Sequence, residues 1–103
     1  MAILSYLRFA LTEEADVEEF ERDLRAMLAL AAVQPGHRWT ELGPALSDPR
    51  AYIIVSEWDD VERVRAWEHV EEHEGIAVRW EPFYREPLVH RRFVPWQRSL
   101  PSP

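Results

Sequence analysis

The stretch over residues 52–73 constrains the fold of this chain most, because it holds a complete strand-to-helix unit. Residues 52–55 are an aromatic and β-branched run typical of a buried strand, and we expect that strand to end at Trp58. Asp59 then offers a side-chain oxygen as an N-cap, and Glu62 stands three residues later, as in a capping box. The sequence therefore predicts a strand followed at once by a helix.

The predicted helix carries Val64 and Trp67 on one face and places His69 and His73 one turn apart. Between Trp67 and His73 the helix would turn by about 600°, so their directions differ by roughly 120°. Both side chains can reach one pocket only if the helix breaks or bends between them. Gly75 is expected to end or kink the helix.

His69 and His73 also have a spacing that can chelate zinc, but a metal needs a third ligand, which only His37 or His90 could supply as an imidazole. The segment is not the zinc-protease motif, in which Glu directly follows the first His. We therefore expect no metal site, and we interpret His69 as a solvated residue in a run of Glu. For His73, a pocket position and a surface position both remain open.

Two strands and a helix are predicted ahead of this unit. Residues 2–11 alternate with apolar groups on both faces, which indicates a strand that is covered on both sides. Thr12 is a plausible N-cap for a helix over residues 14–32, whose apolar side chains recur at helical spacing. The Pro-Gly pair within residues 34–36 stops that helix, and residues 37–43 form a second, weakly alternating strand.

The remaining segments complete the pattern. Residues 44–50 are expected to be a turn-rich loop, residues 76–84 a further helical piece and residues 88–94 the fourth strand. The proline-rich residues 95–103 are predicted to be an extended tail. Docking of this tail on a partner chain through Trp96 is one hypothesis.

The element order is β-α-β-β-α-β, which predicts an α+β, ferredoxin-like fold with a four-stranded antiparallel sheet and two helices on one face. The other face of the sheet needs a cover, because the strands carry apolar groups on both sides. A second copy of the chain is the economical cover, with the two sheets face to face as a dimeric α/β barrel. We therefore expect a homodimer, with one folded domain over residues 1–94 and a tail over residues 95–103.

Net charge and composition limit the kinds of partner that this chain can be expected to bind. The formal net charge of −7 argues against nucleic acid and against an anionic membrane. The chain has no cysteine, which fits a reducing compartment, and it opens with neither a basic leader nor a sustained apolar run. We therefore expect a cytoplasmic protein without a signal peptide or a membrane span. The five Trp indicate an aromatic core, an interface or a pocket for a planar ligand.

The arginines on the predicted strands are expected to have structural rather than catalytic roles. Arg8 is expected to be an ion-pair partner, and Arg91 and Arg92 are expected to form a solvated or interface edge. No Ser/His/Asp triad is predicted, because the serines lack the glycines of a nucleophile elbow.

Several motifs together resemble one known family. They are Gln34-Pro35-Gly36-His37, Asp48-Pro49, Val55-Ser56-Glu57-Trp58, and Ala66-Trp67 with His73. With the element order, they make residues 1–94 similar to the antibiotic biosynthesis monooxygenase family, within the dimeric α/β-barrel superfamily. The resemblance implies a small oxygenase that acts on aromatic polyketides such as anthrones without metal or flavin. The family also includes heme-degrading enzymes and proteins with no known reaction.

The resemblance to the heme-degrading members is incomplete. Those members carry an Asn on the first strand, a Trp on the second helix and a His about three turns further on. Trp67 matches the Trp, but Leu7 stands at the Asn position and Ala77 near the His position. We therefore expect no cofactor, and in particular no heme. Other family members have a second His in a Ser-Pro-His turn, and His73 is its nearest match here.

The leading functional hypothesis is a cofactor-independent monooxygenase-like tailoring enzyme that uses dioxygen and a small aromatic, polyketide-type substrate. Trp67 would fix the plane of the substrate, and His73 would take its proton as a general base. The deprotonated substrate could then give an electron to dioxygen unaided. The residues expected to line the pocket are Ser5, Leu7, Phe9, Phe20, Leu24, Trp58 and Trp80.

Two alternatives belong to other classes of function. A non-catalytic aromatic-ligand-binding or stress-response dimer would bind the same ligand without turnover. A polyketide cyclase would form a product without oxygen uptake.

Overall fold

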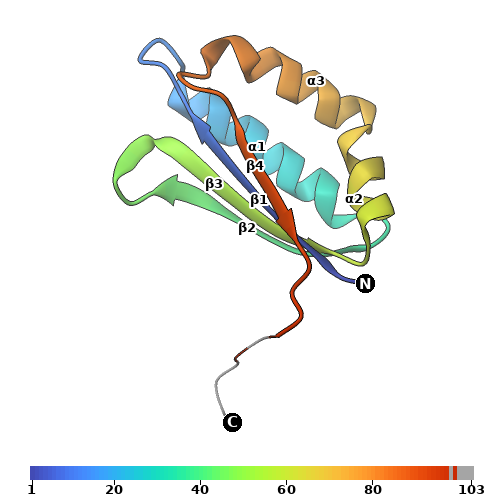
Figure 1. Cartoon of the computed structure of the whole chain (residues 1–103). Helices are drawn as coiled ribbons and strands as arrows, with labels where there is room; N and C mark the ends of the chain where they lie inside the picture. The colour runs from blue at the N-terminus through green and yellow to red at the C-terminus, as the bar shows by residue number, and fades with distance from the viewer. Residues whose placement is uncertain (98, 100–103) are drawn as a thin grey trace.

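Four antiparallel strands form one sheet, and the helices lie against one face of it (Figure 1). The computed structural model describes residues 1–97 and 99. The strand order is β2-β3-β1-β4, which is the predicted ferredoxin-like α+β architecture. In chain order the elements are β1 Ile3–Ala10, α1 Val17–Ala32, β2 His37–Ala45, β3 Asp48–Trp58, α2 Val61–Glu68, α3 Glu71–Trp80, the 3-10 helix η1 Glu81–Phe83 and β4 Val89–Phe93.

Strand β1 lies between β3 and β4, so its pairings decide what faces the helices. Leu7 is opposite Ile54 of β3 and His90 of β4. Because side chains alternate along a strand, Ser5, Leu7 and Phe9 share the helix-covered face. The predicted alternation of the first strand is therefore confirmed.

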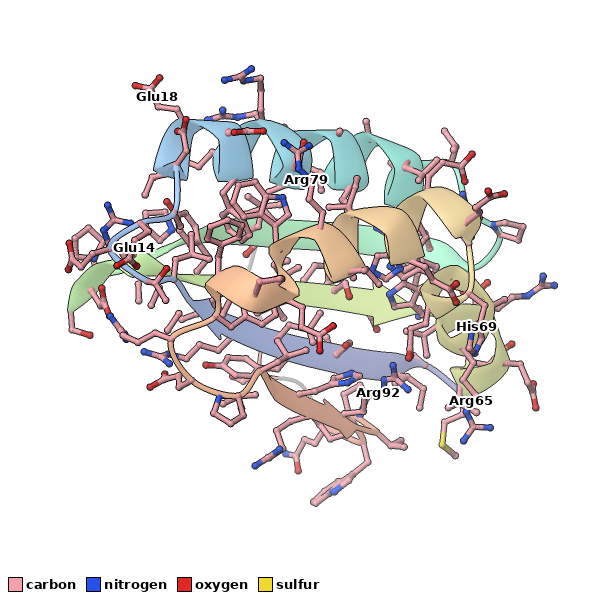
Figure 2. All side chains as sticks on the ribbon, turned by 90° about the horizontal axis from the view of Figure 1, so that it is seen from above. Glu14, Glu18, Arg65, His69, Arg79 and Arg92 are labelled. Carbon is pink, nitrogen blue, oxygen red and sulfur yellow. The ribbon has the colours of Figure 1, made fainter. Side chains whose placement is uncertain are left out.

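The core lies between α1, α3 and this face of the sheet. The ring centroid of Phe20 on α1 lies 5.0 Å from that of Trp80 on α3 and 5.1 Å from that of Tyr52 on β3. The indole Nε1 of Trp80 donates to Asp23 over 2.7 Å. Arg79, which Figure 2 labels, forms an ion pair with the same carboxylate. These contacts fix α3 beside α1, and both helices contribute side chains to the wall of a cavity above the sheet.

Helix α1 begins later than the sequence predicts. Its N-cap is Asp16, whose carboxylate accepts from Glu19 N over 3.1 Å, rather than Thr12. Backbone contacts hold Thr12 elsewhere: its N–H donates to Phe83 O over 2.9 Å, and its carbonyl accepts from Arg50 Nη1 over 2.8 Å. A carboxylate at the helix N-terminus is also favoured by the helix dipole.

The predicted capping box at Asp59 is wrong by one residue. Asp60 is the N-cap of α2 and accepts from Arg63 N over 2.9 Å. Asp59 is engaged with the entry to β2 instead, because its N–H donates to Gly36 O and its carboxylate accepts from Arg38 Nε, each over 2.8 Å.

The helix breaks between Trp67 and His73, as the sequence requires if both are to reach one pocket, but the expected end or kink at Gly75 is wrong. Helix α2 ends at Glu68 and α3 starts at Glu71, with Val70 extended between them at φ −65° and ψ 128°. Gly75 lies inside α3. A β-branched residue followed by an acidic run suits the start of a new helix, which explains the position of the break.

Two other segments differ from the prediction. The expected loop over residues 44–50 is mostly strand, because β2 continues to Ala45 and β3 starts at Asp48. Pro44 is tolerated there because β2 is an edge strand. The helical piece over residues 76–84 is the end of α3 followed by the 3-10 helix.

The second face of the sheet carries apolar groups that the helices do not cover (Figure 1). Tyr6 on β1 is opposite Val55 on β3, Arg8 is opposite Ile53, and Phe93 on β4 is 55% exposed. Arg8 forms the expected ion pair, with Glu86 as its partner.

The tail leaves this face at Phe93, and Trp96 is 86% exposed. The part of the predicted tail at residues 98 and 100–103 lies outside the described residues. None of the helices in the described part of the chain has the length and apolar character needed to cross a membrane.

Candidate functional site

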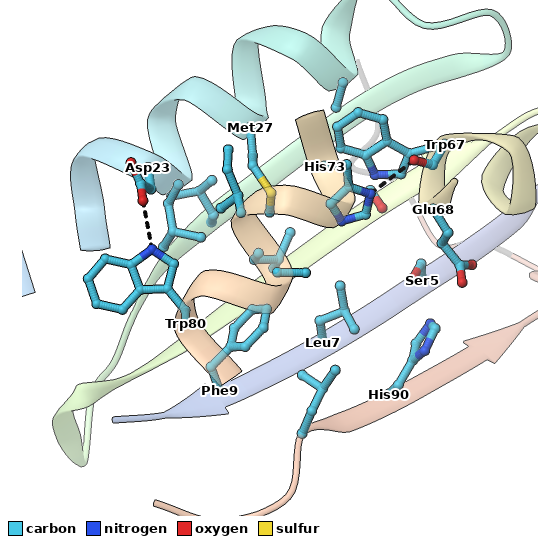
Figure 3. Close-up of a pocket in the computed structure, with 18 of the residues that line it drawn as sticks. Ser5, Leu7, Phe9, Asp23, Met27, Trp67, Glu68, His73, Trp80 and His90 are labelled. Carbon is cyan, nitrogen blue, oxygen red and sulfur yellow. Dashed lines mark hydrogen bonds between the residues drawn. The ribbon is translucent and has the colours of Figure 1, made fainter. Parts of the chain in front are cut away.

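A cavity of about 740 Å³ lies between α1, α2 and α3 on one side and the helix-facing side of the sheet on the other (Figure 3). Its wall is mostly aliphatic and aromatic. Every residue that the sequence analysis selected lies on this wall: Ser5, Leu7, Phe9, Phe20, Leu24, Trp58, Trp67, His73 and Trp80. The structure therefore gathers these side chains around one space, although they come from five elements.

His73 stacks on Trp67 at the end of the cavity beneath the helix break. The two ring centroids are 4.2 Å apart and the ring planes differ by 12°. The His73 Nδ1–H donates to the carbonyl oxygen of Trp67 over 2.9 Å. That bond sets the tautomer of the neutral ring, so Nε2 keeps its lone pair. His73 thus lies on the wall of the cavity, and its role there stays a prediction.

Trp58 supports this stack from the end of β3. Its ring lies 6.1 Å from that of Trp67 with an interplanar angle of 22°, and its Nε1 donates to Ser56 Oγ over 3.1 Å. The His37 ring packs edge-on against Trp58 at 5.1 Å. Burial lowers the pKa of His37, so this imidazole is neutral over a wider pH range than a solvated one. The row of rings fixes the position of Trp67.

Most polar groups on the wall are already satisfied by neighbouring groups. Asp23 accepts from Trp80, Ser56 accepts from Trp58, and Thr40 Oγ1 lies 2.7 Å from His37 Nε2. Burial raises the pKa of Tyr84 to about 12, so its hydroxyl keeps its proton. The groups that retain hydrogen-bonding capacity are the important ones for a ligand, and His73 Nε2 is one of them.

Strand β4 supplies wall residues that the sequence analysis did not select. His90 and Arg92 line the cavity, together with Glu68 from α2, whose carboxylate forms an ion pair with Arg92. The expectation of a solvated or interface edge is therefore wrong for Arg92. It holds for Arg91, which is exposed and donates through Nη1 to His90 O over 2.8 Å. Alternation along β4 separates Arg91 from Arg92, but only the register with β1 shows which one faces inward.

His69 lies outside the cavity, at the periphery of the molecule (Figure 2). It is the C-cap of α2, its side chain is 80% exposed, and its Nδ1 lies 3.0 Å from Glu74 Oε1. The helix break therefore removes the one-turn spacing expected for His69 and His73. Within residues 1–97 and 99, no group of three or more His, Cys, Asp or Glu side chains is arranged to hold a metal ion.

Leu7 and Ala77, which the resemblance to the heme-degrading members places at the Asn position and near the His position, both line the cavity. Neither side chain has an atom that can bind iron or donate a hydrogen bond to an iron-bound group. At these two positions the wall does not fit heme.

Comparison with known proteins gives one family and one fold. A family model described as antibiotic biosynthesis monooxygenase matches residues 3–78. Protein SchA from Streptomyces halstedii is 31% identical over 74 residues, which cover 72% of this chain and 18% of SchA. The chain thus spans less than a fifth of that relative.

Solved structures share the fold at low sequence identity. SnoaB, a cofactor-independent oxygenase from Streptomyces nogalater, has a TM-score of 0.81 at 20% identity, with 98% of each chain covered. Rv0793 from Mycobacterium tuberculosis has a TM-score of 0.87 at 11% identity, with 97% of this chain and 100% of that chain covered. A putative antibiotic biosynthesis monooxygenase from Nitrosomonas europaea has a TM-score of 0.83 at 11% identity and covers 89% of this chain and 88% of its own.

Proposed function

The chain belongs to the antibiotic biosynthesis monooxygenase family, and on that premise we propose that it is a small cofactor-independent monooxygenase acting on a flat aromatic, polyketide-type substrate. One observation carries the proposal: an imidazole with a free Nε2 is held at the end of an aromatic-walled cavity by a stack and a hydrogen bond. The fold shared with an oxygenase that works without a cofactor supports the reaction class.

The cavity suits a fused aromatic ligand. Its volume of about 740 Å³ is within the range of small-molecule pockets, roughly 300–1,000 Å³. Phe9, Trp80 and Trp67 offer ring surfaces, and Leu7 and Ile76 offer flat aliphatic contacts. Such a wall excludes water, which strengthens the electrostatic interactions of the few polar groups that remain.

In this proposal His73 is the general base and Trp67 is its positioning residue. The hydrogen bond to the Trp67 carbonyl uses Nδ1, so Nε2 is the nitrogen that accepts a proton from the substrate. The stack covers one face of Trp67 with the imidazole. Trp67 lies between Trp58 and His73 in the row of rings, so it orients the base directly and meets the substrate with its edge.

The chemistry needs only the substrate and dioxygen. His73 removes a proton from an activated CH₂ group, and the resulting carbanion gives one electron to dioxygen. The substrate radical and superoxide combine to form a C–O bond, and after protonation the hydroperoxide expels water to leave a ketone. In total, CH₂ and O₂ become C=O and H₂O, so one oxygen atom enters the product and the other enters water.

We also propose that the uncovered face of the sheet is the dimer interface. Tyr6, Ile53 and Val55 lie on that face, and Phe93 is largely exposed at its edge. Two such sheets packed together would form the barrel of the fold family and remove these groups from water. In this arrangement residues 1–94 are the folded domain, and the tail over residues 95–103 docks on the partner chain through Trp96.

Oxygen uptake with an anthrone or 1-naphthol tests the function. The oxygenase requires uptake that depends on the protein and falls sharply in His73→Ala but not in His69→Ala, which changes an exposed histidine outside the cavity. Saturable binding without uptake would identify a binding protein instead. Product formation without uptake would identify a cyclase.

A further inference from the structure

The β4 wall of the cavity carries polar atoms that the proposed reaction does not use. His90 and Arg92 are two residues apart on β4, so their side chains leave the same face of the sheet, and both line the cavity. Three buried side-chain atoms on this wall have no hydrogen-bond partner within the described part of the chain: His90 Nε2, Arg92 Nε and Glu68 Oε1. A buried polar atom without a partner costs about 1–3 kcal/mol. Glu68 Oε1 faces the Arg92 guanidinium as an ion pair, whereas no such contact engages His90 Nε2 or Arg92 Nε within the described part of the chain.

Strand pairing and an ion pair hold this part of the wall in place. Ladder pairing sets Arg92 opposite Ser5 and His90 opposite Leu7 on the central strand β1. The Nη2 atom of Arg92 forms an ion pair with Glu68 of α2, which balances the charge of the guanidinium but leaves Nε unused. Figure 3 shows the His90 ring pointing from β4 into the cavity, on the side where Ser5 and Glu68 lie.

The two unpaired atoms have complementary capacities. The Nε–H of an arginine can only donate a hydrogen bond. Burial, and secondly the charge of Arg91, lower the pKa of His90, which favours the neutral ring, and Nε2 is the acceptor in the tautomer that carries its proton on Nδ1. A hydroxyl is the ligand group that meets both demands, since its oxygen accepts and its hydrogen donates. A ketone can only accept, and a methyl group can do neither.

We propose that His90 and Arg92 form a hydroxyl-recognition subsite, which selects aromatic ligands that carry a phenolic or enolic hydroxyl and turns that hydroxyl toward β4. The subsite rests on the proposed function, because its occupant is the flat aromatic substrate of the same cavity. His73 enters the cavity from α3 and His90 from β4 (Figure 3). The recognised hydroxyl and the carbon that loses its proton are therefore at different positions of the ring system.

The test compares two ligands of similar shape, 1-naphthol and 1-methylnaphthalene, whose dissociation constants are measured by quenching of tryptophan fluorescence. His90→Phe keeps a flat ring and removes both nitrogens. Arg92→Lys keeps a cation opposite Glu68 and removes the Nε–H. The matched control is Arg91→Lys, on the same strand but on the opposite, exposed face.

The measured quantity is the ratio of the two dissociation constants, because general hydrophobicity and small changes in packing cancel in it. We expect His90→Phe and Arg92→Lys each to shift this ratio against 1-naphthol by about threefold to tenfold, the effect of one net hydrogen bond. Arg91→Lys should leave the ratio within twofold of wild type. Thermal unfolding of each variant verifies folding, and if His90→Phe does not fold, Arg92→Lys decides the question.

Wild-type-like ratios in the folded variants would overturn the subsite and leave the two atoms to ordered water. If neither ligand binds the wild-type protein, both the subsite and the proposed use of the cavity are wrong. Hydroxyl-selective binding without oxygen uptake would overturn the oxygenase alone and leave the subsite standing.

Discussion

The substitution His73→Ala is the most direct test of how this cavity could work. It removes the imidazole whose Nε2 is free, together with the stack on Trp67 at 4.2 Å and the hydrogen bond of 2.9 Å to the Trp67 carbonyl. The cavity keeps its other walls, so the substrate can still enter. The variant should therefore bind a substrate and turn it over slowly.

The loss of a general base should lower kcat by about 10²–10⁴-fold, or about 2.7–5.4 kcal/mol in the activation free energy. The folded protein should also be less stable, because it loses one hydrogen bond of about 0.5–1.5 kcal/mol and a stacked pair of about 0.5–1.5 kcal/mol. The total expected loss of stability is about 1–3 kcal/mol.

The assay is oxygen consumption with an anthrone in an oxygen electrode, at 25 °C and with saturating substrate. His69→Ala is the control, since His69 is 80% exposed and outside the cavity, and its rate should stay within a factor of two of wild type. Added free imidazole should partly restore turnover in His73→Ala, because it can occupy the space left by the side chain. A purely structural role for His73 predicts no such rescue.

A His73→Ala rate within a factor of two of wild type would remove the base from the mechanism and leave the pocket. A slow variant that imidazole does not rescue, and whose melting temperature has fallen close to the assay temperature, would assign the loss to packing instead.

Other properties can be tested independently. Gly36 has φ +84°, and a Cβ there would lie 2.5 Å from Arg63 Cγ, so Gly36→Ala should lower the free energy of unfolding by about 1–3 kcal/mol in urea titrations. The control Gly75→Ala, inside α3, should raise it by about 0.5–1 kcal/mol, and equal effects would contradict the argument. Light scattering should give a dimer at micromolar concentration, and a stable monomer near 12.2 kDa would refute the interface. Deleting residues 95–103 should weaken the dimer by about 1–3 kcal/mol if Trp96 is buried by the partner, whereas an unchanged dissociation constant would show that the tail is free. Hemin should bind weakly, and a tight Soret shift at sub-micromolar protein would revive heme degradation.

Local sequence patterns determined most of the fold. The β-branched run at residues 52–55, the helical spacing in residues 14–32 and the alternation of residues 2–11 each depend on neighbours in the chain. Such periodicities need no knowledge of tertiary contacts. Helix geometry alone likewise shows that Trp67 and His73 can reach one pocket only if the helix breaks between them.

The start of helix α2 depended on contacts that local patterns do not contain. Asp59 has the right residue type for an N-cap, but its contacts with Gly36 and Arg38 draw it to the start of β2, and Asp60 takes the role. Adjacent acidic residues are equivalent as local signals, so only the contact with a distant segment distinguishes them.

Tertiary structure alone decided which polar groups meet in the cavity. From the sequence, Trp67 and His73 could share a pocket only if the helix broke between them. Neither their ring stack nor the hydrogen bond of His73 Nδ1 could be predicted. The sequence also left Arg92 at an edge, because nothing local distinguishes it from Arg91. The register of β4 on β1 turns His90 and Arg92 inward, and the contact of Arg92 with Glu68 joins β4 to α2. Pairings between segments this far apart in the chain are set by the packing of the whole sheet and its helices, which short-range periodicity does not encode.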